Sequence, residues 1–187
     1  MLAESAVPEQ TFKVNAIAQS SRFCELFETY QPGLRRLVSA YVTNPTDRED
    51  LLQEIAAGIW KSLPGFRGDA SERTWIYRVA HNIAIRSSSR QRARGAHEFL
   101  IETGFDHPSA NPGAEHELLA EERRRALINS IRELPILDRQ IITLHLEGLS
   151  AAEIEDVTGI LRGAVATRLT RIRQRLSERM QAEGLGL

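Results

Sequence analysis

The chain has 187 residues, of which 42% are hydrophobic and 26% are charged, and it contains a single cysteine. This composition is typical of a globular protein with one or two small domains, and no apolar run is long enough to cross a bilayer. No secretory signal precedes the first helix and one cysteine cannot form an internal disulfide, so we expect a cytoplasmic protein without membrane insertion.

Charge is unevenly distributed along the chain, although the net charge is only −1. The segment 61–94 holds eight Lys and Arg residues against two acidic ones, and the segment 162–180 holds six arginines against one glutamate. Between them, residues 95–122 carry seven acidic residues and no Lys or Arg. Most of the basic residues are arginines, whose planar guanidinium suits bidentate contacts with phosphate and guanine. Two basic segments therefore indicate a nucleic-acid partner that the net charge conceals.

The spacing of apolar residues predicts helices throughout the chain and no strands. A first helix is expected over 23–41, where Pro32 should bend or divide it. Thr46 or Asp47 is the expected cap of a second helix. A loop over 66–72 then leads to a third helix that continues into a basic tail. The fold class is therefore all-α, with these three helices forming a first compact domain.

A stretch rich in glycine and proline divides the chain into two halves. Residues 95–114 have few periodic apolar positions, which is typical of a flexible linker, here an acidic one. About twenty residues reach roughly 65–70 Å when extended, enough to hold two domains on separate DNA sites. We therefore predict an N-terminal extension over 1–20, a first domain over 21–94 and a second domain over 115–181.

The second domain ends in a helix-turn-helix pattern. Asp138 is expected to cap a helix that reaches Leu146. Ser150 and Glu153 form a capping box that opens a short helix, and Gly159 makes the turn into a final arginine-rich helix. A short helix, a glycine turn and a longer basic helix are typical of a helix-turn-helix unit that binds DNA.

The final helix of such a unit enters the major groove with its N-terminal residues toward the base edges. Opposite its apolar stripe lie the residues that we expect at base edges: Arg162, Ala166, Thr167, Thr170 and Arg171. Arg168, Arg173 and Arg175 are placed to reach phosphates. A solvated amphipathic helix is the alternative that the spacing alone leaves open.

The third helix of the first domain carries groups that can stack on or hydrogen-bond to unpaired bases. These are Trp75, Tyr77, Arg78, His81 and Asn82. The alternative is that Trp75 and Trp60 are core residues, and for Trp60 this alternative is favoured.

Two sets of motifs resemble a known family, the ECF (extracytoplasmic function) sigma factors, group IV of the bacterial primary-type sigma superfamily. The first half resembles sigma domain 2 in the runs Asp50–Ile55, Phe66–Gly68 and Thr74–Asn82. The second half is similar to sigma domain 4 in the runs Leu134–Pro135, Glu147–Ser150, Glu153–Ile154 and Gly159–Ile160, with Arg168 and Arg171 following. The resemblance covers about residues 22–94 and 115–180, in the family's order and with a linker between them.

The resemblance implies a protein that directs core RNA polymerase to specific promoters and assists promoter melting by binding alone, without a cofactor. It implies that a surface of the second helix, formed by Asp50, Leu51, Gln53 and Glu54, binds the clamp helices of the polymerase β′ subunit. An acidic, amide-bearing face beside an exposed Leu51 suits a basic partner. The implied partners also include the β flap of the polymerase, promoter DNA and an anti-sigma factor that keeps the protein silent.

The resemblance also divides promoter recognition between the two domains. A flipped base of the −10 element would be received by Arg67, Arg73, Trp75, Arg78 and Asn82. Extruding a base costs a few kcal/mol, and stacking of roughly 1–3 kcal/mol per base offsets that cost. Trp75 is either a wedge at this site or part of the core beneath it. The final helix would read the −35 element as duplex.

Two positions of the final helix depart from the family pattern. Many relatives have Lys or Arg where Ala166 stands, and a small or apolar residue where Arg162 stands. One basic contact is therefore expected to be missing, and Arg162 can supply another from a different angle. We predict an unusual −35 preference from this exchange.

Rival interpretations follow from the same residues. A stand-alone helix-turn-helix regulator shares the second domain but needs no polymerase, and a polymerase-sequestering relative keeps the contacts without initiating transcription. An enzyme is the least expected class, because no nucleophile, base or metal-ligand set converges and the five histidines lack metal-ligand spacing. Cys24, near an apolar face, is expected to be a small buried side chain, and a redox-sensing thiol is the alternative.

Overall fold

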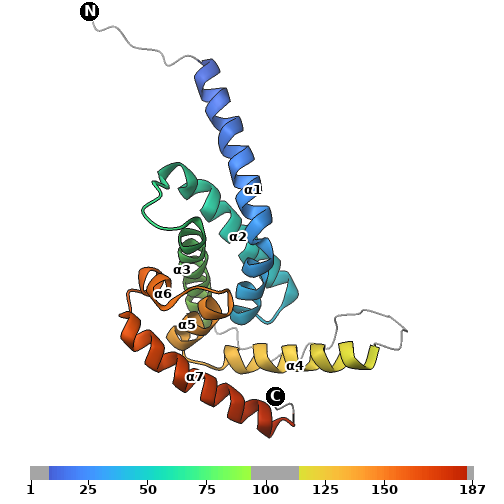
Figure 1. Cartoon of the computed structure of the whole chain (residues 1–187). Coiled ribbons are helices and arrows are strands. Elements are labelled where there is room, and N and C mark those ends of the chain that lie inside the picture. Colours follow the sequence, from blue (N-terminus) through green and yellow to red (C-terminus); the bar gives the residue numbers. More distant parts are fainter. Residues whose placement is uncertain (1–8, 94–113, 185–187) are drawn as a thin grey trace, which may run out of the picture.

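The computed structural model describes residues 9–93 and 114–184, with the side chains of 17–90 and 119–184. All α-helices and the one 3₁₀ turn within these ranges are shown in Figure 1, and no strand occurs among these residues. The elements in chain order are α1 (Glu9–Tyr41), α2 (Pro45–Ser62), η1 (Leu63–Gly65), α3 (Glu72–Ala93), α4 (Ala114–Arg132), α5 (Ile136–Leu146), α6 (Ala151–Thr158) and α7 (Arg162–Ala182). The all-α prediction is confirmed. The predicted linker, residues 95–114, lies outside the described residues except for Ala114, where α4 begins.

Helix α1 continues without a break through Pro32, so the proline does not divide it. The missing N–H of a proline removes one helical hydrogen bond, and packing against the rest of the domain keeps the helix continuous. The cap of α2 is Asn44, whose side-chain oxygen accepts from the backbone N–H groups of Thr46 and Asp47. The prediction that Thr46 or Asp47 caps this helix is therefore wrong by two to three positions. Pro45 occupies the first turn, where its missing N–H has no cost.

Helices α1, α2 and α3 pack on one another and form the first domain, which we call domain 2 (Figure 1). The core of domain 2 contains Leu34, Ile55, Ile59 and Ile76, each at most 1% exposed. Trp60 is half-buried and packs edge-on against Phe23, which confirms that Trp60 belongs to the packing of the domain.

Helices α4 to α7 form the second domain, which we call domain 4. The capping box at the start of α6 is present, with Ser150 and Glu153 bonded to each other's backbone N–H groups. Gly159 ends α6 with a φ of 74°, a left-handed conformation that glycine adopts without strain. The predicted inward residues of α7 are buried, namely Val165, Leu169, Ile172 and Leu176. The predicted cap at Asp138 is wrong, because α5 begins two residues earlier, after Pro135.

The two domains share one continuous apolar core. Helix α3 of domain 2 packs against α6 and α5, while α1 packs against α4 and α5. The buried cluster extends from Leu26 in α1 to Leu176 in α7 without interruption. In Figure 1, α5 and α6 lie directly beside α3, and α7 lies on the far side of α5. This arrangement decides which of the predicted binding residues are accessible.

Candidate nucleic-acid and polymerase interfaces

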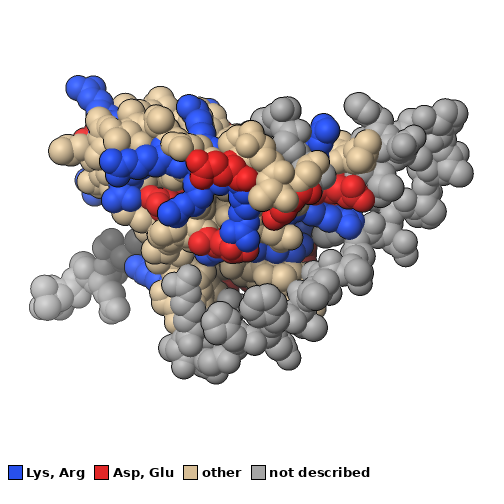
Figure 2. Space-filling view, turned by 90° about the horizontal axis from the view of Figure 1, so that it is seen from below, with Lys and Arg blue, Asp and Glu red and all other residues tan. Residues whose placement is uncertain are grey.

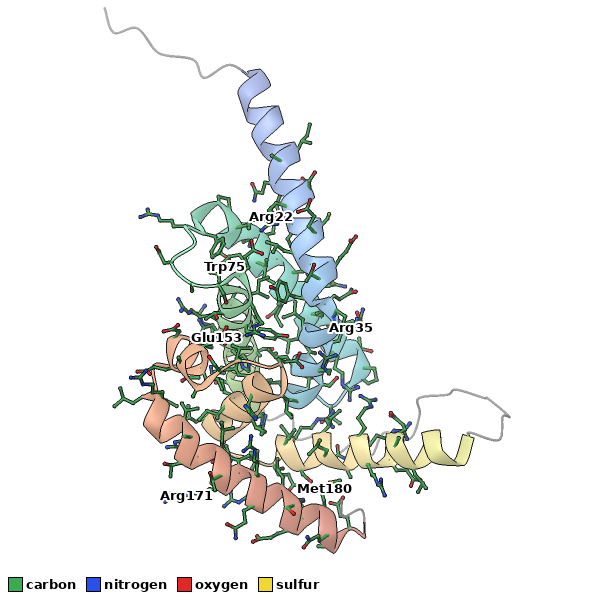
Figure 3. The ribbon with its side chains drawn as sticks, viewed as in Figure 1. Arg22, Arg35, Trp75, Glu153, Arg171 and Met180 are labelled. Atoms are coloured by element: carbon green, nitrogen blue, oxygen red, sulfur yellow. The ribbon has the colours of Figure 1, made fainter. Side chains whose placement is uncertain are left out.

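The outer face of α7 is open to solvent along its first three turns. All the residues predicted to read base edges are exposed, namely Arg162, Ala166, Thr167, Thr170 and Arg171. The hydroxyls of Thr167 and Thr170 donate to the carbonyls of Gly163 and Ala166, at 3.1 Å and 3.2 Å. Arg171 has no hydrogen-bond or ion-pair partner among the described residues, and its side chain lies on α7 away from α3 (Figure 3). The helix therefore presents free guanidinium groups beside small side chains.

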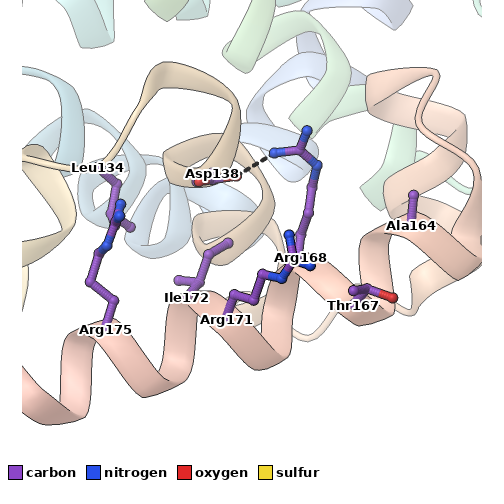
Figure 4. A pocket seen from close by; sticks show the side chains of 8 residues that line it. All are labelled: Leu134, Asp138, Ala164, Thr167, Arg168, Arg171, Ile172 and Arg175. Atoms are coloured by element: carbon purple, nitrogen blue, oxygen red, sulfur yellow. Dashed lines mark hydrogen bonds and ion pairs between the residues drawn. The ribbon is translucent and has the colours of Figure 1, made fainter.

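Arg168 differs from its neighbours because it is tied to the body of domain 4. Its Nη1 donates to Oδ1 of Asp138 at 2.8 Å, across a pocket of about 540 Å³ between α5 and α7. Figure 4 shows this pocket, with Arg171 and Arg175 also on its wall. Because Asp138 holds the guanidinium, Arg168 fixes α7 against α5 and is less available to phosphates than Arg171.

Seen from below, the molecule shows many Lys and Arg side chains interspersed with smaller groups of Asp and Glu (Figure 2). This side includes α4 and α7, which lie lowest in Figure 1. Arg173 of α7 contacts the ring of His145, and burial together with that positive charge lowers the pKa of His145. The partly neutralised surface agrees with the net charge of −1, and the exposed cations of α7 are Arg162, Arg171, Arg173 and Arg175.

The predicted −10 residues fall into an exposed and a covered group. Arg67 and Asn82 are exposed, and Trp75 is half-buried with its ring centroid 4.9 Å from that of Phe66. Trp75 thus packs on the core at the edge of the loop that follows η1. Its role as wedge or as support remains a prediction.

The covered group consists of Arg73 and Arg78. Arg73 donates from Nη2 to both carboxylate oxygens of Glu153, at 3.0 Å and 3.1 Å. The Arg73 side chain is therefore bound to α6 of domain 4. Figure 3 shows Glu153 on α6 facing α3. Arg78 is half-buried, and its Nε atom is buried without a hydrogen-bond partner. In this arrangement neither side chain is fully free to contact a base or a phosphate.

Tyr77 and His81 are not available to DNA in this structure. Their side chains are 3% and 0% exposed, so the expectation that they contact unpaired bases is wrong here. His81 lies between the Tyr41 hydroxyl, 3.0 Å from Nδ1, and the Thr143 hydroxyl, 3.5 Å from Nε2. Burial lowers the pKa of His81 from 6.5 to about 3, so the ring is neutral near pH 7. The helical period placed His81 on the side that the second domain covers.

Glu153 collects more hydrogen bonds than a capping box requires. Besides the Ser150 N–H at 2.9 Å, its carboxylate accepts from Arg73 and, at 3.4 Å, from the Thr74 hydroxyl. The backbone N–H of Ser150 and then the guanidinium of Arg73 outweigh partial burial and lower the pKa of Glu153 from 4.5 to about 2. The Glu153 carboxylate is therefore ionised in the folded protein near neutral pH.

The predicted polymerase-binding surface on α2 is smaller than the sequence suggested. Asp50 and Gln53 are exposed, and Glu54 is exposed but accepts from Arg90 at 2.8 Å. Leu51 is only 2% exposed and belongs to the core of domain 2, so its expected exposure is wrong. The helical period explains the error, because Leu51 lies one turn before Ile55 on the inward face.

Cys24, candidate metal ligands and candidate membrane helices remain to be compared with the structure. Cys24 is exposed, which corrects the expectation of a buried side chain. Within the described ranges no three His, Cys, Asp or Glu side chains are grouped so that they could hold a metal ion. Over the same ranges, none of the helices combines the length and apolar character needed to cross a membrane.

Sequence reasoning did not find the contacts between the domains. Glu147 at the end of α5 accepts from Arg36 at 2.7 Å and from the Tyr77 hydroxyl at 3.0 Å. Arg132 of α4 donates to the Ser39 carbonyl at 2.8 Å. The residues of these pairs are more than 65 positions apart, so no local periodicity connects them.

Comparison with protein families matches both halves of the chain. The model of Sigma-70 region 2 matches residues 26–94, and the model of Sigma-70 region 4 matches residues 119–176. A helix-turn-helix regulator that acts alone is not favoured, because region 2 is present as well.

Full-length relatives and solved structures agree with this match. The ECF RNA polymerase sigma-E factor of Escherichia coli is 32% identical over 161 residues, covering 81% of this chain and 83% of the relative. The sigma factor RpoE of Bartonella quintana, solved with the anti-sigma factor NepR, is 21% identical with a TM-score of 0.65, covering 86% of this chain and 97% of that one. CnrH, solved with the cytosolic domain of CnrY, is 24% identical with a TM-score of 0.61, covering 89% and 94%. The chain belongs to the ECF family of RNA polymerase sigma factors.

Proposed function

We propose that the chain recruits core RNA polymerase to promoters through three surfaces, one that binds the polymerase and two that bind the −10 and −35 elements. Exposed Asp50 and Gln53 on α2, with Glu54 beside them, bind the clamp helices of β′. The loop after η1 and the start of α3 receive the −10 element through Arg67, Arg73, Trp75, Arg78 and Asn82. The outer face of α7 reads the −35 duplex. The chain acts by binding and catalyses no reaction.

The observation that carries this proposal is the open face of α7. Arg171 is exposed and has no hydrogen-bond or ion-pair partner among the described residues, and the small side chains of Ala166 and Thr167 on the same helix allow close approach to a base edge. An arginine that donates two hydrogen bonds to one guanine is the commonest specific contact in the major groove, and Arg171 is the tenth residue of α7, on its exposed face. Arg162 occupies the first position of α7 and extends this surface at its N-terminal end.

The relative positions of the surfaces on α2 and α3 support the same division. Asp50 lies near the start of α2, whereas Trp75 and Asn82 lie on α3, so the acidic and the basic surfaces of domain 2 are formed by separate helices. An acidic surface suits a basic protein partner, and a basic aromatic surface suits a single strand. RpoE of Bartonella quintana is solved in complex with an anti-sigma factor, NepR, and we extend that kind of partner to this chain. A cytoplasmic location follows from these partners, together with a β-flap contact by domain 4.

The test is transcription from a library of fork-junction promoters with purified core polymerase, with and without the protein. Selective open-complex formation only when both are present supports the proposal and gives both element preferences. Binding to core without initiation would instead identify a sequestering relative. Specific duplex binding without core would identify a regulator that acts alone.

A further inference from the structure

The turn between α6 and α7 ends on an exposed leucine. Leu161 is 72% exposed, more than any other large apolar side chain of the described residues. It is also the N-cap of α7, a position that favours Ser, Thr, Asp or Asn because their side chains accept from the first N–H groups of the helix. Leu161 forms no such bond. A single exposed leucine is ordinary, but a residue that is unfavourable for folding in two separate ways is typical of a functional position.

Hydrogen bonds from neighbouring residues hold the backbone at Leu161 in one place. Glu155 on α6 supplies the acceptor that the leucine lacks, because its Oε2 accepts from the backbone N–H of Arg162 at 3.1 Å. On the other side, the N–H of Ile160 donates to the Thr158 hydroxyl at 3.2 Å. The Leu161 carbonyl accepts from two N–H groups in the first turn of α7, at 2.8 Å and 3.0 Å. The backbone is therefore already ordered, and a partner that binds the side chain does not have to order it.

The first turn of α7 leaves room for a close approach to the bases. Gly163 and Ala164 are exposed, and a Cβ atom added at Gly163 would meet nothing within 4 Å. Figure 4 shows Ala164 and Thr167 at this end of the helix. The start of a recognition helix faces base edges in the major groove. Leucine has no donor or acceptor for a base edge, and the methyl group that the bases present in this groove is the C5-methyl of thymine.

We propose that Leu161 is a specificity-determining residue of the −35 contact, whose side chain packs on the C5-methyl group of one thymine in the major groove. This role rests on the function proposed above, and it adds an apolar reader to the arginines of α7. The leucine and the methyl group leave water together, which favours binding. The other three bases present no methyl group there, so the contact selects thymine at one position of one strand.

The test removes the methyl group of thymine without changing base pairing. In the promoter that the chain and core polymerase together select from the library, each thymine of either strand of the −35 element is replaced in turn by deoxyuridine. The affinity of the holoenzyme for each promoter is measured with the wild type and with Leu161→Ser. Leu146→Ser is the matched control, because Leu146 is also an exposed leucine, at 56%, but lies at the end of α5. Titration of labelled core polymerase measures the assembly of each holoenzyme.

With the wild type, deoxyuridine at one position weakens promoter binding roughly fourfold, the effect of leaving about one methylene-sized group unburied. Leu161→Ser binds the thymine promoter more weakly than the wild type does, and the same replacement weakens its binding no further, so the two changes are not additive. Leu146→Ser responds to deoxyuridine as the wild type does. Because the methyl effect is a ratio of two affinities of one protein, it does not depend on the folded fraction of that protein.

The assignment of Leu161 to a thymine methyl is overturned if no thymine shows a methyl effect that Leu161→Ser abolishes. It is overturned as well if Leu161→Ser weakens binding to core polymerase instead of binding to the promoter. A failure of the proposed function gives a different result. In that case the holoenzyme selects no −35 sequence, and Arg171→Ala binds every promoter as the wild type does.

Discussion

Helices α3 and α7 are both rich in arginine, but their arginines differ in how many are bound to acidic residues of the same chain. On α7, Arg171 is exposed and has no partner among the described residues. On α3, Arg73 is bound to Glu153 and Arg90 is bound to Glu54. A basic helix is available to nucleic acid only where acidic residues of the same chain do not reach it. The comparison separates the proposed −35 surface on α7, which is exposed in this structure, from the proposed −10 surface on α3, which domain 4 partly covers.

The largest expected effect concerns the covered helix. His81 is neutral in the folded state with a pKa of about 3, and its unfolded value is 6.5, so the unfolded chain binds more protons between these values. The free energy of unfolding therefore falls as the pH drops below 6.5, approaching a slope of about 1.4 kcal/mol per pH unit. Urea unfolding of wild type and His81→Gln between pH 6.5 and 5 measures this slope.

The chosen pH range excludes the main acidic contributor. Glu153 has a lowered pKa of about 2, so its stabilising effect is complete above 4.5 and is lost only as the pH falls from 4.5 toward 2. His81→Gln should have a flatter profile than the wild type between pH 6.5 and 5. Equal slopes in the two proteins would show that His81 does not titrate on unfolding.

The open helix gives the next largest effect. Arg171→Ala should lose roughly 1–3 kcal/mol of −35 duplex binding and relax the base preference at one position. Arg168→Ala is the comparison, because Asp138 already holds that guanidinium. Removing Arg168 should lower the melting temperature and leave the base preference unchanged. Competition binding with −35 variants measures the base preference of both proteins, and thermal unfolding measures the melting temperature. A change of base preference in the Arg168 variant alone would reverse the roles assigned to Arg168 and Arg171.

The acidic surface of α2 gives a smaller effect. Asp50→Ala should weaken core polymerase binding by about 0.5–1 kcal/mol, a two- to fivefold change, whereas Glu54→Ala should change it less because Arg90 already neutralises Glu54. Titration of labelled core at two salt concentrations measures the difference. A larger loss for Glu54 would mean that Arg90 releases it in the complex.

Much of domain 4 follows from local sequence. The Ser150–Glu153 capping box and the Gly159 turn depend on neighbours within a few residues, so the helix-turn-helix was predictable. The face of α7 followed from its period, because its inward positions are buried as expected. Two errors were local as well: Asn44 caps α2 in place of Thr46 or Asp47, and Leu51 lies on the inward face that the helical period assigns to it.

The covered part of the candidate site was not predictable by the same means. The roles of Glu147 and Tyr77 depend on two helices from opposite halves of the chain meeting at Gly33. A one-dimensional period can assign Tyr77 to a face of α3 but does not identify the element that packs on that face. His81 illustrates this limit, since an aromatic base reader and a buried interdomain residue have the same spacing.

The smallest expected effect concerns the position where α7 departs from its family. Ala166 is exposed on α7, so the longer side chain of Ala166→Lys can extend toward DNA without displacing another residue of the described ranges. A new phosphate contact would steepen the dependence of log affinity on log salt by about 0.9 and leave the selected −35 sequence as it was, whereas a new base contact would change that sequence. We expect the second outcome, because residues at the start of a recognition helix face base edges. Ala166→Met is the uncharged control of similar length, and selection from a randomised −35 duplex with all three proteins measures the preference. An unchanged sequence in the Lys variant would contradict the idea that Ala166 gives this helix an unusual preference, and would leave Arg162 and Arg171 as its readers.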